Sequence, residues 1–501
     1  MGISLSSVLQ MIFQWDVIAA LFGGSVIGII IGAMPGLGPV TAQAVLLPLT
    51  FKMSPVAGVA FQGAIWASGV YGGSWTAILI NVPGTSMSAA TALDGYPLSR
   101  QGRALEALGT ATMSSFLGGV IGVLILMTLA PVIVDYVVMF GPPEYVWINL
   151  LALVIIAVSN KGNLLKGMLA GFFGLILSLI GIDSVLGVPR YTFGTIYLQN
   201  GIDFIPVMVG LFGFAEIISM MQQKGSISET GKLEGSFLEG FKATFRHWKA
   251  LLIGLVVGSI VGIIPGIGGS AANLLAYGEA QRQSKEPEKF GKGSLEGIIA
   301  SESSNNAIEG TAMIPTLTLG IPGSSSAAIL LVVLMMKGFT PGRMLFSSNG
   351  SFVMSFFLCL LIAQLLMVLV GMILMKVFSY ITVIPIELLA VSVAALCFMG
   401  VYSINRSIYD VLVAVIFGIV GYCLKKYHYP VVGLVVGLIL GSSMETSFAQ
   451  SLAISGGSYL IFFNRPICIA LILIILAVFM LPRISERHAK SKASRKGATG
   501  P

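Results

Sequence analysis

The sequence predicts an all-α polytopic membrane protein, and two observations carry that prediction. Of its 501 residues, 56% are hydrophobic and only 10% are charged, whereas soluble proteins contain roughly 45–50% and 25%. Long runs also lack Asp, Glu, Lys and Arg, including those between Asp16 and Lys52 and between Lys249 and Glu279. Because a membrane-spanning helix needs about 20 apolar residues, each run can hold a span. A soluble globular, disordered or fibrous protein is excluded.

Hydropathy predicts about 11–13 spans together with broken or re-entrant helices. They lie near 17–34, 56–80, 107–134, 145–159, 164–182, 204–222, 250–266, 298–320, 350–375, 384–402, 407–424, 430–447 and 466–482. We therefore divide the chain into a first membrane half (1–222), a basic cytoplasmic linker (223–249), a second membrane half (250–482) and a basic, disordered tail (483–501).

The two halves repeat each other. Gly28-x3-Gly32-x2-Pro35-Gly36-Leu37-Gly38 returns as Gly258-x3-Gly262-x2-Pro265-Gly266-Ile267-Gly268, and Val82-Pro83-Gly84-Thr85-Ser86 returns as Ile321-Pro322-Gly323-Ser324-Ser325. Two internal repeats, here about 20–100 and 250–345, are typical of secondary transporters. The first copy follows a segment without Lys or Arg, and the second follows the basic linker. The positive-inside rule therefore predicts inverted repeats and a cytoplasmic C-terminal tail.

Each copy contains two Pro-Gly breaks at membrane depth, where irregular backbone is tolerated only when it is buried in protein or lines a wet cavity. A half-helix that starts after a break presents free N–H groups to an anion, and the freed carbonyls suit Na⁺ or a proton carrier. The alternative is a kink whose small residues serve close helix packing. The predicted substrate-binding residues are Pro35, Gly36, Gly38, Thr41, Asn81, Gly84, Thr85, Ser86, Gly266, Gly268, Ser270, Gly323, Ser324 and Ser325.

A further polar group lies in the predicted span 298–320. Glu302, Asn305, Asn306 and Glu309 have the i, i+3, i+4, i+7 spacing of one helix face. Ionisable residues inside a membrane are rare and usually functional, although a solvated helix start is the alternative. The predicted cation-coupling residues are Glu302, Asn305, Asn306 and Asn273. Glu216 and Glu445 are weaker candidates.

Motifs for chemistry are missing from the sequence. It has no GxxxxGK[ST] loop, no HExxH and no Ser/His/Asp arrangement, and no two of its four cysteines have CxxC spacing. We therefore expect no catalytic residue, no ATP-driven transport and no cofactor or metal other than a coupling ion, Na⁺ or H⁺. The net charge of +7 fits membrane topology rather than a nucleic-acid partner.

Several motifs together resemble one family. They are Gly-x-x-Pro-Gly-Leu-Gly at 32–38, Leu-Leu-Pro-Leu-Thr-Phe at 46–51, Tyr-Gly-Gly-Ser at 71–74, Asn-Val-Pro-Gly at 81–84, Leu-Asp-Gly-Tyr-Pro at 93–97, Pro-Gly-Ile-Gly-Gly at 265–269, Ser-Asn-Asn-Ala at 304–307 and Leu-Gly-Ile-Pro-Gly at 319–323. The ordered set resembles the large membrane subunit of the tripartite tricarboxylate transporters, the TctA family, over nearly the whole chain.

The resemblance implies a permease of the bacterial inner membrane that imports a carboxylate on a Na⁺ or H⁺ gradient. The cargo would be a tricarboxylate such as citrate, or a related dicarboxylate or aromatic carboxylate. A small membrane subunit (TctB-like) and a periplasmic solute-binding protein (TctC-like) would be its partners. An anion channel-like pore without cation coupling uses the same helix ends and is the alternative.

Overall fold

The computed structural model describes residues 4–34, 36–137, 139–159, 164–183, 187–222, 234–375 and 386–479. Within them the chain is almost entirely helical, which confirms the predicted all-α class. The chain divides into two compact units, Met1–Val137 with Asp203–Lys426, and Val138–Ile202 with Tyr427–Pro501. Pro35, residues 223–233 of the predicted linker and the predicted tail 483–501 lie outside the described residues.

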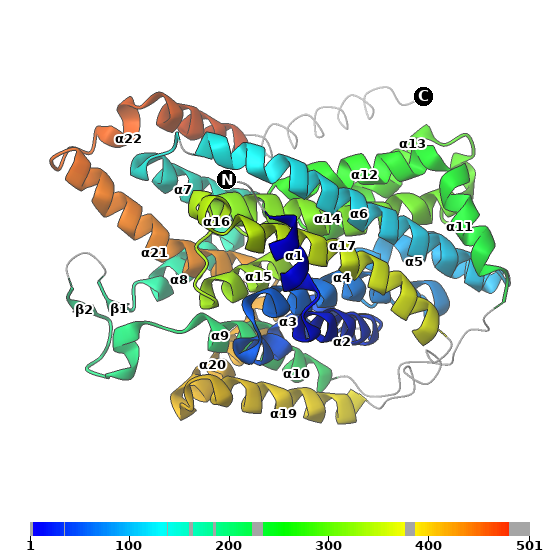
Figure 1. Ribbon diagram of the computed structural model, residues 1–501, viewed down its shortest axis with the longest axis horizontal. Helices are drawn as coiled ribbons and strands as arrows, with labels where there is room; N and C mark the ends of the chain where they lie inside the picture. Colours follow the sequence, from blue (N-terminus) through cyan, green and yellow to red (C-terminus); the bar gives the residue numbers. More distant parts are fainter. Residues whose placement is uncertain are drawn as a thin grey trace, which may run out of the picture. The chain divides into compact units, whose positions relative to one another are not determined.

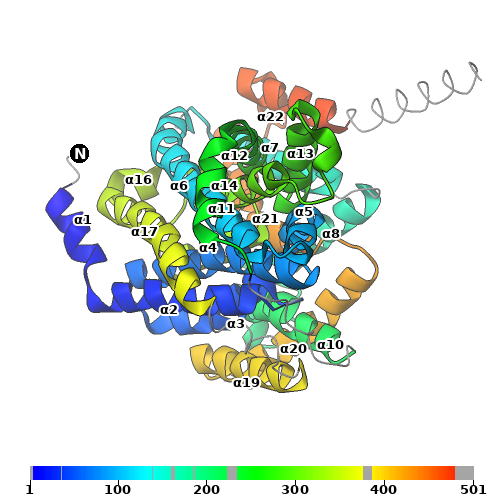
Figure 2. The ribbon, with the colours of Figure 1, turned by 90° about the vertical axis from the view of Figure 1, so that its right-hand side faces the viewer.

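The first unit is built around α14 (Leu295–Leu319), which packs most extensively on α6 and α12 and also contacts α4, α5, α13 and α15 (Figures 1 and 2). The other helices of this unit are α1 (Leu5–Ile12), α2 (Trp15–Gly32), α3 (Gly38–Leu46), α4 (Pro55–Ile80), α5 (Ala89–Arg100), α6 (Ala104–Val137), α9 (Phe204–Met208), the π-helix η4 (Val209–Phe214), α10 (Ala215–Met220), α11 (Phe237–Arg246), α12 (Trp248–Ile263), α13 (Gly269–Gln283), α15 (Ser325–Met336), α16 (Arg343–Ser348), α17 (Gly350–Leu374), α19 (Ile386–Asn405) and α20 (Ile408–Lys426).

The same order of elements occurs twice in this unit. In the first occurrence, α2, a break, α3, the 3₁₀ turn η1 (Leu47–Lys52), the long helix α4, a second break and α5 follow one another. In the second, α12, α13, η5 (Pro287–Lys289), α14 and α15 take the corresponding places. Asn81 and Gly320 end the two long helices in the left-handed conformation, with φ of 58° and 73°. Inverted orientation of the two halves stays a prediction.

Several helices are long and apolar enough to cross a membrane. Among the described residues there are five, α2, α6, α17, α20 and α21 (Val431–Ile454), and α11 with α12 forms one pair bent by 77°. Shorter apolar helices are Pro142–Val158, Leu164–Ser178, Phe204–Met220, Ser325–Met336, Ala390–Asn405 and Pro466–Phe479. The protein is therefore a multi-pass membrane protein.

Glycine allows α6 and α14 to approach with their backbones in contact. An added Cβ at Gly122 would lie 3.0 Å from both Cα and the carbonyl carbon of Ala307, and Gly310 packs in turn on the backbone of Gly122. Gly118 lies in the same way against Ser303. Since lipid supplies no hydrophobic drive between helices, such close packing is a main source of their association.

The second unit contains α7 (Pro142–Ser159), α8 (Leu164–Ser178), the short antiparallel strands β1 (Gly181–Ile182) and β2 (Pro189–Arg190), the 3₁₀ turn η3 (Tyr197–Asn200), α21, α22 (Ile461–Asn464) and the helix Pro466–Phe479. Two ion-pair groups fasten it. Arg190 pairs with Asp183 at 3.0 Å and with Glu445 at 2.5 Å, and Arg465 pairs with the fully buried Glu144 at 2.5 Å. Glu445, a weaker candidate from the sequence, is thus a partner of Arg190.

The glycine contact between α6 and α14 predicts a specific loss of stability. Gly122→Ala forces the two helices apart, and overpacking of this kind costs about 1–3 kcal/mol. Gly278→Ala on α13 makes the same chemical change where nothing lies within 4 Å, so it leaves stability unchanged or slightly raised. Thermal unfolding in detergent measures both, and equal melting temperatures for the two variants would contradict the packing described here.

Candidate functional site

The segments around the four breaks lie next to one another. An added Cβ at Gly38, after the first break, would lie 3.9 Å from Cγ2 of Thr85, after the second. Ser270, after the third break, donates a hydrogen bond to Ser86 over 2.9 Å. The N–H of Gly266, in the third break, donates to the carbonyl of Gly323, in the fourth, over 3.4 Å. The chain thus brings all four irregular segments to one place.

Backbone groups within the breaks have local partners. The N–H of Gly84 donates to the carbonyl of Gly73 over 3.1 Å. The Thr85 hydroxyl accepts from the N–H of Ser88, and the Ser324 hydroxyl caps α15 by accepting from the N–H of Ala327 over 3.1 Å. Side-chain capping of this kind satisfies donors that a broken helix leaves open.

The predicted substrate-binding residues differ in their exposure. Gly36, Gly38, Gly266 and Gly268 have φ of 91°, 57°, 86° and 80°, which favours glycine. The protein leaves some of the set exposed, namely Gly36, Asn81, Ser86 and Gly268. It buries others, namely Thr41, Gly84, Thr85 and Gly323. Gly38, Gly266, Ser270, Ser324 and Ser325 are half-buried.

Glu302 is fully buried on α14 and accepts hydrogen bonds from three hydroxyl groups. Ser74 of α4 lies 2.6 Å from Oε1, Ser115 of α6 lies 2.8 Å from Oε2, and Thr91 of α5 also donates to Oε1. Among the described residues, no Lys, Arg or His forms an ion pair with this carboxylate. One side chain thereby ties three helices to α14.

The other predicted cation-coupling residues lie in two places. The Asn273 amide donates to the carbonyl of Met87 over 2.8 Å, which joins α13 to the segment after the second break. Asn305 and Asn306 are fully buried on α14, and the Asn306 amide lies 3.4 Å from Oε1 of Glu309.

An ion pair stands beside the first break. Glu216 on α10 pairs with Lys425 at 2.5 Å, and an added Cβ at Gly36 would lie 3.4 Å from its Oε1. The π-helix η4 ends two residues before this glutamate, and such segments are frequent at functional sites.

Two charged side chains hold the starts of the long helices. Oδ1 of Asp94 accepts from the N–H groups of Gly293 and Ser294, over 2.9 and 2.8 Å, where α14 begins. Burial raises the pKa of Asp94 above its usual range, against the opposing effect of these two donors. Lys337 donates to the carbonyls of Phe51 and Met53, over 2.8 and 2.7 Å, just before α4. Each clamp joins the end of one occurrence to the long helix of the other.

Sequence reasoning missed the partners of the acids on α14, which are Ser74, Thr91, Ser115 and Gln364. Gln364 of α17 donates to Oε2 of Glu309 over 2.9 Å. The signal for it was weak, because Gln364 is one of two amides, with Asn349, in the charge-free run from Arg343 to Lys376.

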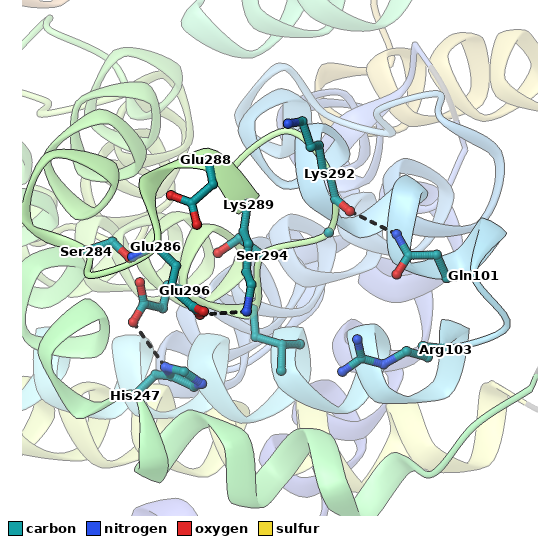
Figure 3. A pocket seen from close by; sticks show the side chains of 12 residues that line it. Gln101, Arg103, His247, Ser284, Glu286, Glu288, Lys289, Lys292, Ser294 and Glu296 are labelled. Atoms are coloured by element: carbon teal, nitrogen blue, oxygen red, sulfur yellow. Dashed lines mark hydrogen bonds and ion pairs between the residues drawn. The ribbon is translucent and has the colours of Figure 1, made fainter.

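A polar pocket of about 530 Å³ lies away from the breaks, around the 281–294 segment (Figure 3). Arg103 pairs with Glu106 and Lys289 with Glu286, while Nδ1 of His247 lies 3.1 Å from Glu296. The lining holds three basic side chains, Arg103, Lys289 and Lys292, and three acidic ones, Glu286, Glu288 and Glu296. Since positive and negative groups balance here, we do not assign the pocket to an anionic substrate.

These features define a polytopic helical membrane protein with interrupted helices that meet inside one unit. Residues 18–436 match the model of the tripartite tricarboxylate transporter TctA family. The chain therefore belongs to the TctA family, and its role is that of a transporter component.

Two relatives from Agrobacterium vitis are similar to this chain. One is described as "Uncharacterized 52.8 kDa protein in TAR-I ttuC' 3'region" and is 36% identical over 473 residues, which is 94% of each chain. The other, "Uncharacterized protein in TAR-II ttuC' 3'region", is 31% identical over 234 residues, which is 46% of this chain and 97% of the relative. No solved structure matches.

The three hydroxyl groups that donate to Glu302 predict how the protein responds when this carboxylate is removed. Glu302→Leu leaves three buried hydroxyls without their acceptor, and each orphaned group costs about 1–3 kcal/mol. Glu286→Gln removes a carboxylate that is 58% exposed and leaves stability within about 0.5 kcal/mol. Thermal unfolding in detergent compares them, and wild-type stability of Glu302→Leu would refute the structural role given to this carboxylate.

Proposed function

We propose that this chain is the permease subunit of a binding-protein-dependent secondary transporter that imports a carboxylate on a Na⁺ or H⁺ gradient. The observation that supports it best is the meeting of the four breaks, joined across the halves by Ser270 and Ser86. Interrupted helices at a repeat interface are where secondary transporters bind substrate and ion. Family membership supports transport as the general role.

The chemistry at the breaks suits a carboxylate. Helices α13 and α15 begin at Gly269 and Ser325, and hydroxyl groups of Thr85, Ser86 and Ser270 surround the same place. N–H groups and hydroxyls at a helix start bind anions without a full positive charge. A tricarboxylate such as citrate, or a related dicarboxylate or aromatic carboxylate, is the proposed cargo.

The two acids on α14 support coupling to a cation. Glu302 and Glu309 are buried, and no Lys, Arg or His of the described residues pairs with either. A buried charge without a counter-charge is costly, so a proton or Na⁺ at this helix is favoured. Asn305 and Asn306 supply amide oxygens on the same helix, whereas Asn273 supplies one on α13, beside the second break.

The family description names a tripartite transporter. We therefore infer two partners, a small membrane subunit of the TctB type and a periplasmic solute-binding protein of the TctC type. The proposed location is the bacterial inner membrane with a cytoplasmic C-terminal tail. The lipid bilayer is the third proposed partner, because it surrounds the membrane-spanning helices.

Uptake by proteoliposomes tests this proposal. The chain is reconstituted with both partners, and labelled citrate, a dicarboxylate and an aromatic acid are supplied under an imposed Na⁺ or H⁺ gradient. We expect saturable uptake that stops when the cation gradient is collapsed. Uptake that persists unchanged without a gradient would contradict coupling and favour the anion-pore alternative.

The variant Ser270→Ala tests whether the substrate binds at the breaks. Loss of the hydroxyl that reaches Ser86 is expected to lower uptake at least about fivefold, since hydrogen bonds to a charged group contribute about 1.5–3 kcal/mol. Ser403→Ala is the matched control, because among the described residues its exposed hydroxyl bonds only to the carbonyl of Gly400, three residues earlier. Equal uptake by both variants would place the substrate elsewhere.

A further inference from the structure

Glu309 lies at the contact of α14 with α17 and is held there by two amides. The residue is 5% exposed. Gln364 of α17 donates to Oε2 over 2.9 Å, and Asn306, one turn earlier on α14, lies 3.4 Å from Oε1. The Asn306 amide also reaches the sulfur of Met367 at 3.7 Å. The carboxylate is therefore surrounded by neutral groups.

The amide oxygens of the same two side chains have no partner. Oδ1 of Asn306 and Oε1 of Gln364 accept no hydrogen bond from any residue that the structure describes, although the two residues are only 0% and 1% exposed. Buried acceptors of this kind are uncommon and costly. The cluster thus holds one formal negative charge and two amide oxygens for which the described part of the chain supplies no donor.

A cation satisfies this set better than a proton does. A proton on Glu309 provides a single O–H and so reaches at most one amide oxygen. A half-turn of each amide about its soft terminal torsion instead turns both oxygens toward the carboxylate, and a cation binds all of them at once. Carboxylate and amide oxygens are the donors that hard cations prefer.

The neighbouring helix leaves room for this arrangement. Gly119 of α6 lies against the Gln364 amide, where an added Cβ would clash first with Oε1 and would also lie 2.7 Å from Nε2. Any larger residue at this position would displace the amide from Glu309. The space that glycine leaves thus places Gln364 in the cluster.

From these observations we propose that Glu309, Asn306 and Gln364 form a binding site for one monovalent cation, Na⁺. The single carboxylate matches a single positive charge, which argues against a divalent ion. The site differs from Glu302, two turns earlier, whose oxygens already have three hydroxyl donors. The inference rests on the proposed cation coupling and assigns the coupling ion a place.

Binding of radiolabelled Na⁺ to the purified chain in detergent, in K⁺ or choline buffer at fixed pH, tests the site without transport. We expect saturable binding to the wild type and at least a tenfold loss of affinity in Glu309→Gln. Gly119→Ala leaves the carboxylate in place and is expected to weaken binding through Gln364. Glu279→Gln, on the exposed part of α13 and paired with Arg282, keeps wild-type affinity. Size-exclusion profiles and melting temperatures establish that each variant is folded.

Each outcome decides the matter. Loss in Glu309→Gln and Gly119→Ala, with Glu279→Gln intact, supports the site. Wild-type binding that Glu309→Gln retains, or that Glu302→Gln alone removes, overturns it. No Na⁺ binding together with uptake driven by a pH gradient also overturns it, while the proposed function stands. Uptake that needs no cation gradient defeats the proposed function instead, whichever way the binding measurement turns out.

Discussion

Backbone N–H and C=O groups that lack hydrogen-bond partners are costly inside a membrane. In this chain, four helix breaks that would leave such groups open lie next to one another. The protein answers by packing the interrupted segments on each other. Gly266 donates to Gly323 across two breaks, and Gly84 donates to Gly73 beside another. Hydroxyl caps at Thr85 and Ser324 satisfy further donors. The positions of α3, α5, α13 and α15 follow from this requirement.

Close packing around α14 connects the segments at the breaks to the rest of the first unit. Gly118 and Gly122 let α6 lie backbone to backbone with α14, and the three hydroxyls on Glu302 then fasten α4, α5 and α6 to the same helix. Asp94 and Lys337 hold the starts of the two long helices. The acids of α14 are consequently enclosed by neutral polar groups in a unit whose breaks lie open at Gly36, Asn81 and Ser86.

Much of this could be predicted from the sequence, because it depends on local chemistry. The breaks follow from Pro-Gly segments in apolar surroundings, and the polar face of α14 follows from helical spacing alone. The contacts that other helices make with the acids of α14 could not be predicted in this way. Gln364 meets Glu309 from 55 residues away, and Ser74 meets Glu302 from 228 residues away. No periodicity encodes which helix lies opposite which, since that depends on the packing of all of them.

The account depends most on the meeting of the breaks, and a cross-link measures it directly. With the four native cysteines replaced by alanine, Ser86→Cys and Ser270→Cys are introduced together, and a protease site in the 223–249 segment allows the halves to be separated. Hydroxyls 2.9 Å apart place the two Cβ atoms within reach of a disulfide, so mild oxidation should keep the halves joined on a non-reducing gel. Ser86→Cys with Ser403→Cys should not do so. Separation of the halves in the first pair, with both thiols free to label, would contradict the account.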